Sequence, residues 1–199
     1  MTNFHVVKPF WADKQKAGAV VLRFGYETGT TGVAVSEGVE HKLATSWRGP
    51  AGAPQELTDS PWQVLSSPVD ALDFALLRLE KPAGDDVVNG SPRSFLTLTA
   101  RGFNPTDPIL ILQHPQAAPL KLSFGAVEKL DPPNHVLYVV NTDDGSSGSP
   151  CLTQDLKTTA IHHYGQTSNN RGVTHKAILA FFATKCDELK TQGLERLIP

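Results

Sequence analysis

This 199-residue sequence has few cysteines, a small net charge and no long apolar run. Its two cysteines, Cys151 and Cys186, are too few for the disulfide framework of a small secreted domain, so we expect reduced thiols and a cytoplasmic protein. The formal net charge of −2 gives no strong attraction to nucleic acid or to an anionic membrane, and we expect neither partner. No run of about 18 apolar residues occurs, so we expect no membrane-spanning helix.

Short apolar segments separated by glycine- and proline-containing turns make up most of the chain. Many short strands with such turns favour an all-β barrel or sandwich. The helical spacing of Ile178, Phe182 and Leu189 predicts a helix over 174–189, and residues 46–61 are expected to form a surface loop. The expected strands cover 19–24, 32–35, 62–65, 73–79, 109–112, 120–127, 136–140, 158–162 and the vicinity of 172–173.

The stretch 143–151 (DDGSSGSPC) has the features of a nucleophile loop. Gly145 lies two residues before Ser147 and Gly148 directly after it, so the backbone can turn tightly without a Cβ clash. In such a turn the N–H groups of Gly145 and Ser147 could converge on one developing oxyanion. The same composition is typical of a flexible loop, so this stretch alone leaves both interpretations open.

Two upstream segments favour the first interpretation. His5 lies in residues 2–7 (TNFHVV), which we expect to begin as a strand, and Asp73 opens the apolar strand 73–79 (DFALLRL). With Ser147 they give the order His–Asp–Ser, which is that of chymotrypsin-like proteases and differs from the orders in subtilisins and α/β-hydrolases. Asp70 is a competing carboxylate three residues before Asp73.

These two segments, together with GSSGSP at 145–150, resemble the three signature segments of bacterial trypsin-like peptidases. The resemblance implies a serine endopeptidase that forms an acyl-enzyme, with Ser147 as nucleophile and His5 as general base and then acid. It favours Asp73 over Asp70 as the group that orients His5, and it assigns the oxyanion hole to the N–H groups of Gly145 and Ser147. It implies no cofactor and no metal ion, and a protein or peptide as substrate.

The resemblance also implies a fold of two six-stranded antiparallel β-barrels of the chymotrypsin type with a C-terminal helix. We expect residues 1–90 to form the first barrel, 91–108 the linker, and 109–199 the second barrel and the helix. In the family, two strands and a glycine-rich turn precede the histidine segment. We therefore expect the first barrel to lack its N-terminal strands, because the start is misplaced or the chain is a fragment. A fused or associated effector domain is also expected, by analogy with longer proteins that contain such domains.

The stretch 160–165 resembles the pocket strand of bacterial glutamyl endopeptidases, in which a histidine at the place of His162 faces the specificity pocket. Those enzymes also carry a threonine at the place of Thr142. Asn141 stands where trypsin-type members keep the aspartate that binds Lys or Arg. The resemblance therefore implies a preference for Glu or Asp just before the scissile bond. The expected pocket residues are Asn141, Thr142, His162, His163, Tyr164 and Gly165.

Other functions fit the sequence less well. An α/β-hydrolase elbow would need glycine where Ser149 stands, and Asp155 and His162 follow the serine too closely for that fold. A zinc site built from His162, His163 and Cys151 is disfavoured, because adjacent side chains on a strand point to opposite faces. The alternative function is a catalytically silent trypsin-like domain that acts as an interaction or regulatory module.

Ser146 stands where digestive-type members keep an aspartate that pairs with a new N-terminus after zymogen cleavage. That activation switch therefore cannot operate in the same way in this chain. No role is assigned to four further histidines: His114 is expected in a turn, and His41, His135 and His175 are expected at the surface.

Overall fold

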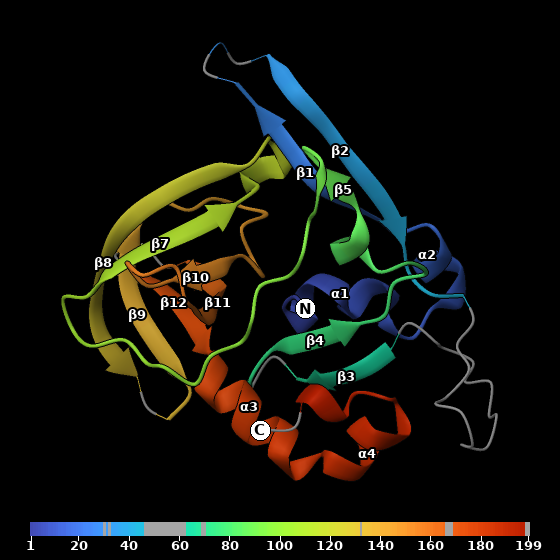
Figure 1. Ribbon diagram of the computed structural model, residues 1–199. Helices are drawn as coiled ribbons and strands as arrows, with labels where there is room; N and C mark the ends of the chain where they lie inside the picture. The colour runs from blue at the N-terminus through green and yellow to red at the C-terminus, as the bar shows by residue number, and fades with distance from the viewer. Residues whose placement is uncertain are drawn as a thin grey trace.

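The computed structural model describes residues 1–29, 31, 33–45, 63–68, 71–131, 133–165 and 169–197. The expectations for 46–61, Trp62 and Asp70 fall outside these residues. Among the described residues, no helix is long and apolar enough to cross a membrane. The elements fall into two groups along the chain; in Figure 1 their strands lie side by side, and the C-terminal helices of the second group extend below the first. The first group contains α1 (Phe4–Trp11), α2 (Lys14–Gly18), β1 (Val21–Thr28), β2 (Ala34–Lys42), β3 (Gln63–Ser67), β4 (Phe74–Leu77), η1 (Ala83–Asp85), β5 (Val87–Val88) and β6 (Ser91–Pro92), and the second contains β7 (Pro108–Gln113), η2 (Pro115–Ala117), β8 (Lys121–Asp131), β9 (His135–Val140), β10 (Pro150–Leu152), β11 (Thr158–Gly165), β12 (Asn170–Thr174), α3 (His175–Thr184), α4 (Cys186–Thr191) and η3 (Glu195–Leu197).

The second half of the chain forms a closed six-stranded barrel, as predicted. Its strands follow the order β10-β11-β12-β9-β8-β7, and neighbouring strands are antiparallel. Ile109, Ile111 and Tyr138 alternate with more exposed residues and form part of the barrel core. A Cβ on Gly125 of β8 would collide with the carbonyl oxygen of Val139. Glycine therefore permits the close approach of β8 and β9 at this point.

The strands of the first half pair in a different way. β1 pairs with β2 and β3 with β4, while single bridges join Leu43 to Leu79 and Thr2 to Ala75. β4 therefore pairs with β3 on one edge and with the N-terminal segment on the other, while the segments that follow β2 and β4 meet at Leu43 and Leu79. In the described residues these pairs do not make a closed barrel, so the predicted first six-stranded barrel is not confirmed. The expected domain boundaries remain a prediction.

The segment around His5 is helical, and the expectation of a strand over 2–7 is wrong beyond the bridge at Thr2. Asn3 has extended backbone angles, and α1 begins at the next residue. Val6 is exposed and Val7 is buried. These neighbouring valines thus lie on a helix that buries one of them and exposes the other.

Two of the histidines expected at the surface are buried. His41 Nε2 lies 2.8 Å from Asp86 Oδ2, and His175 Nδ1 lies 2.9 Å from the carbonyl oxygen of Thr158. Each ring has a polar partner, which makes burial tolerable. Burial lowers the pKa of His175 to about 4, so this ring is uncharged at neutral pH.

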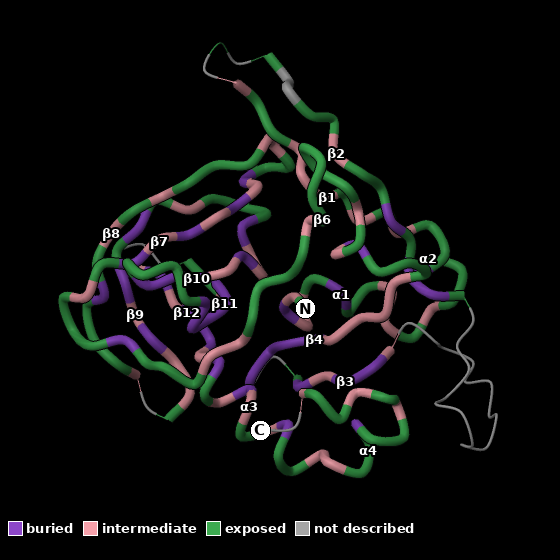
Figure 2. The backbone as a smooth tube through the Cα atoms, in the orientation of Figure 1, coloured by how far each residue is buried: buried purple, intermediate pink, exposed green. Residues whose placement is uncertain are grey.

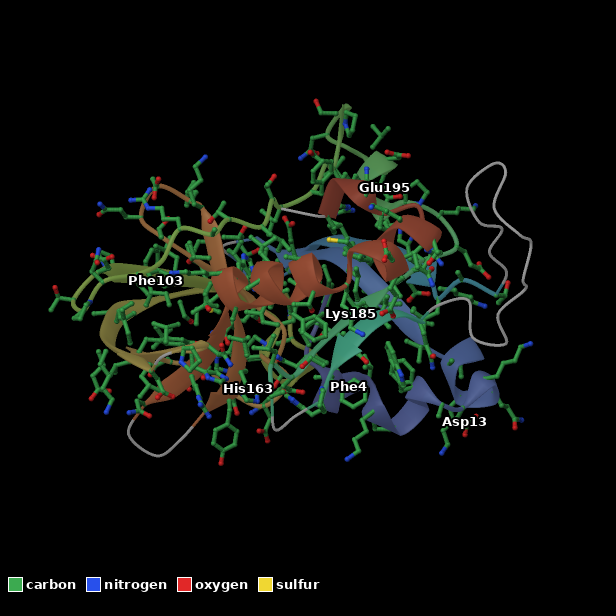
Figure 3. All side chains as sticks on the ribbon, turned by 90° about the horizontal axis from the view of Figure 1, so that it is seen from below. Phe4, Asp13, Phe103, His163, Lys185 and Glu195 are labelled. Carbon is green, nitrogen blue, oxygen red and sulfur yellow. The ribbon has the colours of Figure 1, made fainter. Side chains whose placement is uncertain are left out.

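The predicted C-terminal helix is present as two helices, α3 and α4, which meet at Lys185. The Thr174 side chain caps α3 by accepting a hydrogen bond from the Ala177 N–H. Figure 3 shows α3 crossing from the barrel toward the first half, and Figure 2 shows buried segments of β3 and β4 next to these helices. One apolar cluster joins β3 and β4 to β11, β12, α3 and α4, and its rings include Phe74 and Phe182 with centroids 5.7 Å apart. This cluster fixes β4 against the second half.

We expect Phe182→Ala to lower the free energy of unfolding by about 3–5 kcal/mol, because the change opens a cavity where the two halves meet. Urea unfolding followed by circular dichroism measures it. Phe95→Ala is the control, since the Phe95 side chain is 79% exposed and its loss should cost less than about 0.5 kcal/mol. Equal effects of the two substitutions would contradict the packing described here.

Candidate active site

The structure brings His5, Asp73 and Ser147 together from distant parts of the chain. His5 lies in the first turn of α1, Asp73 directly precedes β4, and Ser147 lies in the loop between β9 and β10. His5 Nδ1 is 2.6 Å from Asp73 Oδ2, and His5 Nε2 is 3.0 Å from Ser147 Oγ. Ser147 and His5 are half-buried, whereas Asp73 is fully buried. The imidazole thus bridges a carboxylate and a hydroxyl.

Asp73 is attached to the segment before and within α1 by its side chain and its backbone. Its Oδ1 accepts a hydrogen bond from the His5 backbone N–H at 2.8 Å. Its carbonyl oxygen accepts one from the Phe4 N–H at 3.2 Å and one from the buried Asn3 side chain at 3.0 Å. Asp73 has a positive φ of 43°, a conformation that aspartate adopts more readily than most residues. These bonds hold the carboxyl group at the His5 ring.

A second imidazole also contacts this carboxyl group. His163 of β11 has Nε2 3.0 Å from Asp73 Oδ2. Burial of the Asp73 carboxyl opposes its ionisation, but hydrogen bonds from His163 and His5 outweigh burial and lower the pKa of Asp73. Asp73 is therefore ionised at neutral pH. Figure 3 shows His163 along the same edge of the molecule as Phe4, the residue before His5.

The nucleophile loop has the tight turns that its glycines predicted. Gly145 and Gly148 have positive φ angles of 89° and 86°. The Gly148 N–H donates to the carbonyl oxygen of His162 at 2.9 Å, and a Cβ at Gly148 would collide with the side chain of Thr2. Among the described residues, the N–H groups of Gly145 and Ser147 have no hydrogen-bond acceptor. Both are thus available to an oxygen outside the chain.

Thr142 and Gly165, two of the expected pocket residues, share a polar neighbour. Thr142 Oγ1 donates to Asn170 Oδ1 at 2.9 Å, and a Cβ on Gly165 would come within 2.9 Å of the same atom. Thr142, Gly165 and Asn170 therefore lie together. Asn141 is exposed, and its carbonyl oxygen accepts from the Gln113 side chain at 2.9 Å. Asn170 was missed by sequence reasoning, because only the pairing of β11 with β12 brings it opposite Gly165.

The histidines of β11 point to opposite faces, as the strand geometry predicted. His162 is buried, with Nδ1 2.6 Å from the Tyr138 hydroxyl in the barrel interior. Burial, and to a smaller extent the charges of His163 and His5, lower the pKa of His162 to about 4. His163 instead turns to Asp73, away from Thr142, and Tyr164 is 56% exposed. The structure thus places the His163 side chain at the carboxylate.

The described residues include one group that could accept a metal ion, and it coincides with this site. One ligand atom each of His5, Asp73 and His163 lie within 4.8 Å of one another. The carboxyl group is already hydrogen-bonded to both rings, so an ion would have to displace these contacts. The zinc set weighed from sequence is not assembled, since Cys151 contacts Tyr138 in the barrel and His163 faces away from it.

Comparisons with known proteins agree with the barrel fold. A family model described as a trypsin-like peptidase domain matches residues 1–161 of this chain. Among solved structures, a Glu endopeptidase in complex with MPD is similar over 93% of this chain and 79% of that chain, with 18% identity and a TM-score of 0.55. The likeness to that structure concerns the fold alone.

Two curated proteins are similar over part of their length. Uncharacterized protein y4fB of Sinorhizobium fredii is 27% identical over 175 residues, which make up 83% of this chain and 23% of that protein. Secreted RxLR effector protein 73 of Plasmopara viticola is 30% identical over 119 residues, which make up 54% of this chain and 28% of that protein. The chain thus spans only about a quarter of the length of these relatives.

We expect His163→Leu to lower the free energy of unfolding at pH 7 by about 1–3 kcal/mol, because the buried carboxylate loses one donor. The lowered pKa of Asp73 means that its ionised form stabilises the fold above the unfolded-state value of ~3.9. This stabilisation is lost as the pH falls through the folded-state pKa. The gap between wild type and variant should therefore persist down to about pH 4 and shrink below it, measured by urea unfolding at several pH values between 7 and about 2.

His163→Gln is the matched control for this experiment. Its side-chain amide can donate to the same carboxylate oxygen, so it should retain most of the wild-type stability at pH 7. A gap between wild type and His163→Leu that stays constant or widens below about pH 4 would contradict an ionised, doubly hydrogen-bonded Asp73.

Proposed function

This chain belongs to the trypsin-like peptidase domain family, and we propose that it is a serine endopeptidase that acts through His5, Asp73 and Ser147. The observation that carries the proposal is the continuous contact from carboxylate to imidazole to hydroxyl, at 2.6 and 3.0 Å. Asp73 and Ser147 lie 68 and 142 positions after His5, so only the folded chain brings the three side chains into contact. The substrate would be a protein or peptide.

In the first step, Ser147 Oγ attacks the scissile carbonyl carbon while His5 Nε2 takes the hydroxyl proton. The 3.0 Å separation between these atoms supports direct proton transfer. The imidazolium formed on His5 has the ionised Asp73 carboxylate at Nδ1. Asp73 thus stabilises the charge on the ring and holds its orientation without taking the proton.

The tetrahedral oxyanion would be held by the N–H groups of Gly145 and Ser147. Their lack of other acceptors among the described residues supports this role. One such donor typically contributes about 10²–10³-fold to kcat. His5 then gives its proton to the leaving amine, which departs and leaves an acyl group on Ser147. Water, activated by His5 in the same geometry, hydrolyses this ester and restores the enzyme.

We further propose a preference for an acidic residue before the scissile bond. Thr142 lies beside Gly165 and the buried Asn170, and the neighbouring Asn141 carries no charge that would attract Lys or Arg. The name of the similar Glu endopeptidase also supports a preference for an acidic residue. His162 is turned to Tyr138 in the barrel interior, and its low pKa leaves it uncharged, so it would add no positive charge to this pocket. Recognition of a carboxylate would then rely on neutral donors, for which the Thr142 hydroxyl would turn from Asn170 Oδ1 to the substrate.

A catalytically silent domain is the alternative function. The strands of the first half favour it, since among the described residues they form separate pairs and no closed barrel. A looser first half would hold His5 and Asp73 less firmly. The short share of the curated relatives that this chain spans is consistent with a domain inside a longer protein, where an attached or associated effector domain would be the partner. The experiments below distinguish the two functions.

We expect a fluorescent fluorophosphonate to modify the wild-type protein at Ser147 alone, located by peptide mass spectrometry. Ser147→Ala should remove both labelling and peptide hydrolysis, by at least about 10³-fold in kcat, without lowering the melting temperature. Ser149→Ala, two residues on, is the matched control and should still be labelled. A folded wild-type protein that is neither labelled nor able to hydrolyse a peptide library would support the silent domain.

For specificity, we expect kcat/KM to be highest for substrates with Glu before the scissile bond in a series that differs only there. Thr142→Val removes one hydroxyl at constant shape, so the ratio of kcat/KM for Glu over Gln should fall about 10-fold. Thr191→Val, on the exposed side of α4, should leave the ratio unchanged. Cleavage mainly after Lys, Arg or Phe would refute the acidic preference while leaving the peptidase activity intact.

A further inference from the structure

Gln113, the last residue of β7, has its side-chain amide buried against the loop that carries Ser147. Its amide nitrogen donates to Ser123 Oγ at 2.7 Å and to the carbonyl oxygen of Asn141 at 2.9 Å. Its amide oxygen accepts from the hydroxyl of Ser146 at 2.5 Å. Both N–H donors are used, so the network itself determines which end of the amide faces Ser146.

We propose that Gln113 is a positioning residue for the loop between β9 and β10. It holds residues 141–147 of this loop in their reactive shape through uncharged hydrogen bonds. This inference rests on the proposed function of Ser147. One amide group contacts both ends of the loop, at Asn141 and at Ser146. Within the loop, the Ser146 N–H donates to the carbonyl oxygen of Asp143 at 3.1 Å, and the Asp143 N–H donates to Ser146 Oγ at 3.3 Å. Ser146 Oγ therefore joins the loop turn to Gln113.

The location of Ser146 explains why this contact matters for the oxyanion donors. Ser146 lies between Gly145 and Ser147, whose N–H groups are the proposed donors. The glycines at 145 and 148 have positive φ angles, and glycine gives the backbone access to many other conformations. The loop glycines alone do not hold the two N–H groups in one orientation. Ser146 is fully buried, and its side chain supplies the missing constraint.

The space around the network shows where the loop could go if it were released. A cavity of about 260 Å³ is lined by Gln113, Ser123 and residues 141–143, among others. Without the amide, the start of the loop can relax into this cavity. Gln113 and Ser146 carry no titratable group, so the proposed constraint needs neither an ion pair nor a new chain terminus. The loop would then be assembled as soon as the protein folds.

The test compares Gln113→Met, which keeps the length and loses the amide, with Gln116→Met. Gln116 is an exposed neighbour whose amide donates to Asp143 Oδ2 at 2.6 Å. We expect Gln113→Met to lower kcat on a peptide substrate about 10²-fold with less than a threefold change in KM, because misplaced oxyanion donors weaken transition-state binding. Gln116→Met should stay within about twofold of wild type. A wild-type kcat in Gln113→Met would overturn the proposal.

Ser146→Ala breaks the same contact from the loop side, and it serves as the test if Gln113→Met does not fold. The double variant should lose no more activity than the stronger single variant, since both remove one shared interaction. Losses that multiply in the double variant would show two independent structural effects and overturn the proposal.

Amide hydrogen exchange separates this inference from the proposed function. Gln113→Met should speed exchange at Ser146 and Ser149, whose N–H groups donate to carbonyl oxygens of the loop, and at Gly148, whose N–H donates to the carbonyl oxygen of His162 on β11, while Gln116→Met should not. This readout needs no turnover. Unchanged exchange at these three amides would refute the role of Gln113 even in an active enzyme, whereas a wild type without fluorophosphonate labelling would refute the peptidase and leave the exchange result valid.

Discussion

The buried carboxylate of Asp73 is the group on which the rest of the site depends. It is fully buried, yet hydrogen bonds from two imidazoles and one backbone N–H keep its pKa low. Two of these donors belong to His5 at the start of α1, and the third belongs to His163 on a strand of the barrel. An ionised group without them would be strongly destabilising in such a position. The site therefore forms only when the N-terminal segment and the barrel are both in place.

The fold brings these parts together through packing next to Asp73. The adjacent Phe74 is fully buried in the apolar cluster that joins β3 and β4 to α3 and α4. The C-terminal helices thus hold β4 on one side, while Thr2 pairs with Ala75 on its edge. Gly148 lies against Thr2, so the nucleophile loop touches the same N-terminal segment. Backbone contacts around β4 therefore connect all three proposed catalytic residues.

Local signals in the sequence predicted most of the barrel strands and the C-terminal helix, whereas the resemblance to trypsin-like peptidases predicted the closed barrel and the meeting of His5, Asp73 and Ser147. They could not predict how β11 directs its histidines, because the strand alternation says that the two rings diverge and not what each will meet. His163 meets Asp73 and His162 meets Tyr138 only after the chain has closed the barrel. The same holds for Gln113, whose partners are 10, 28 and 33 residues away. The helix at His5 was missed because the segment was expected to begin as a strand, whereas only Thr2 forms a β-bridge and α1 begins at Phe4.

Three polar side chains inside the barrel beside the site are neutral. Their neutrality affects both the proposed substrate recognition and the proposed charge stabilisation. Burial raises the pKa of Cys151 to about 12 and lowers that of His162 to about 4, while the pKa of Tyr138 is raised well above its ordinary value, first by burial. The Tyr138 hydroxyl contacts both Cys151 Sγ and His162 Nδ1, and all three groups are uncharged donors or acceptors. In a medium of low dielectric constant a charge acts strongly over short distances. A neutral His162 adds no positive charge that would compete for the carboxylate of Asp73. The substrate binding proposed at Thr142 and the charge stabilisation proposed at His5 can therefore rely on separate groups, Asn170 beside Thr142 and Asp73 beside His5.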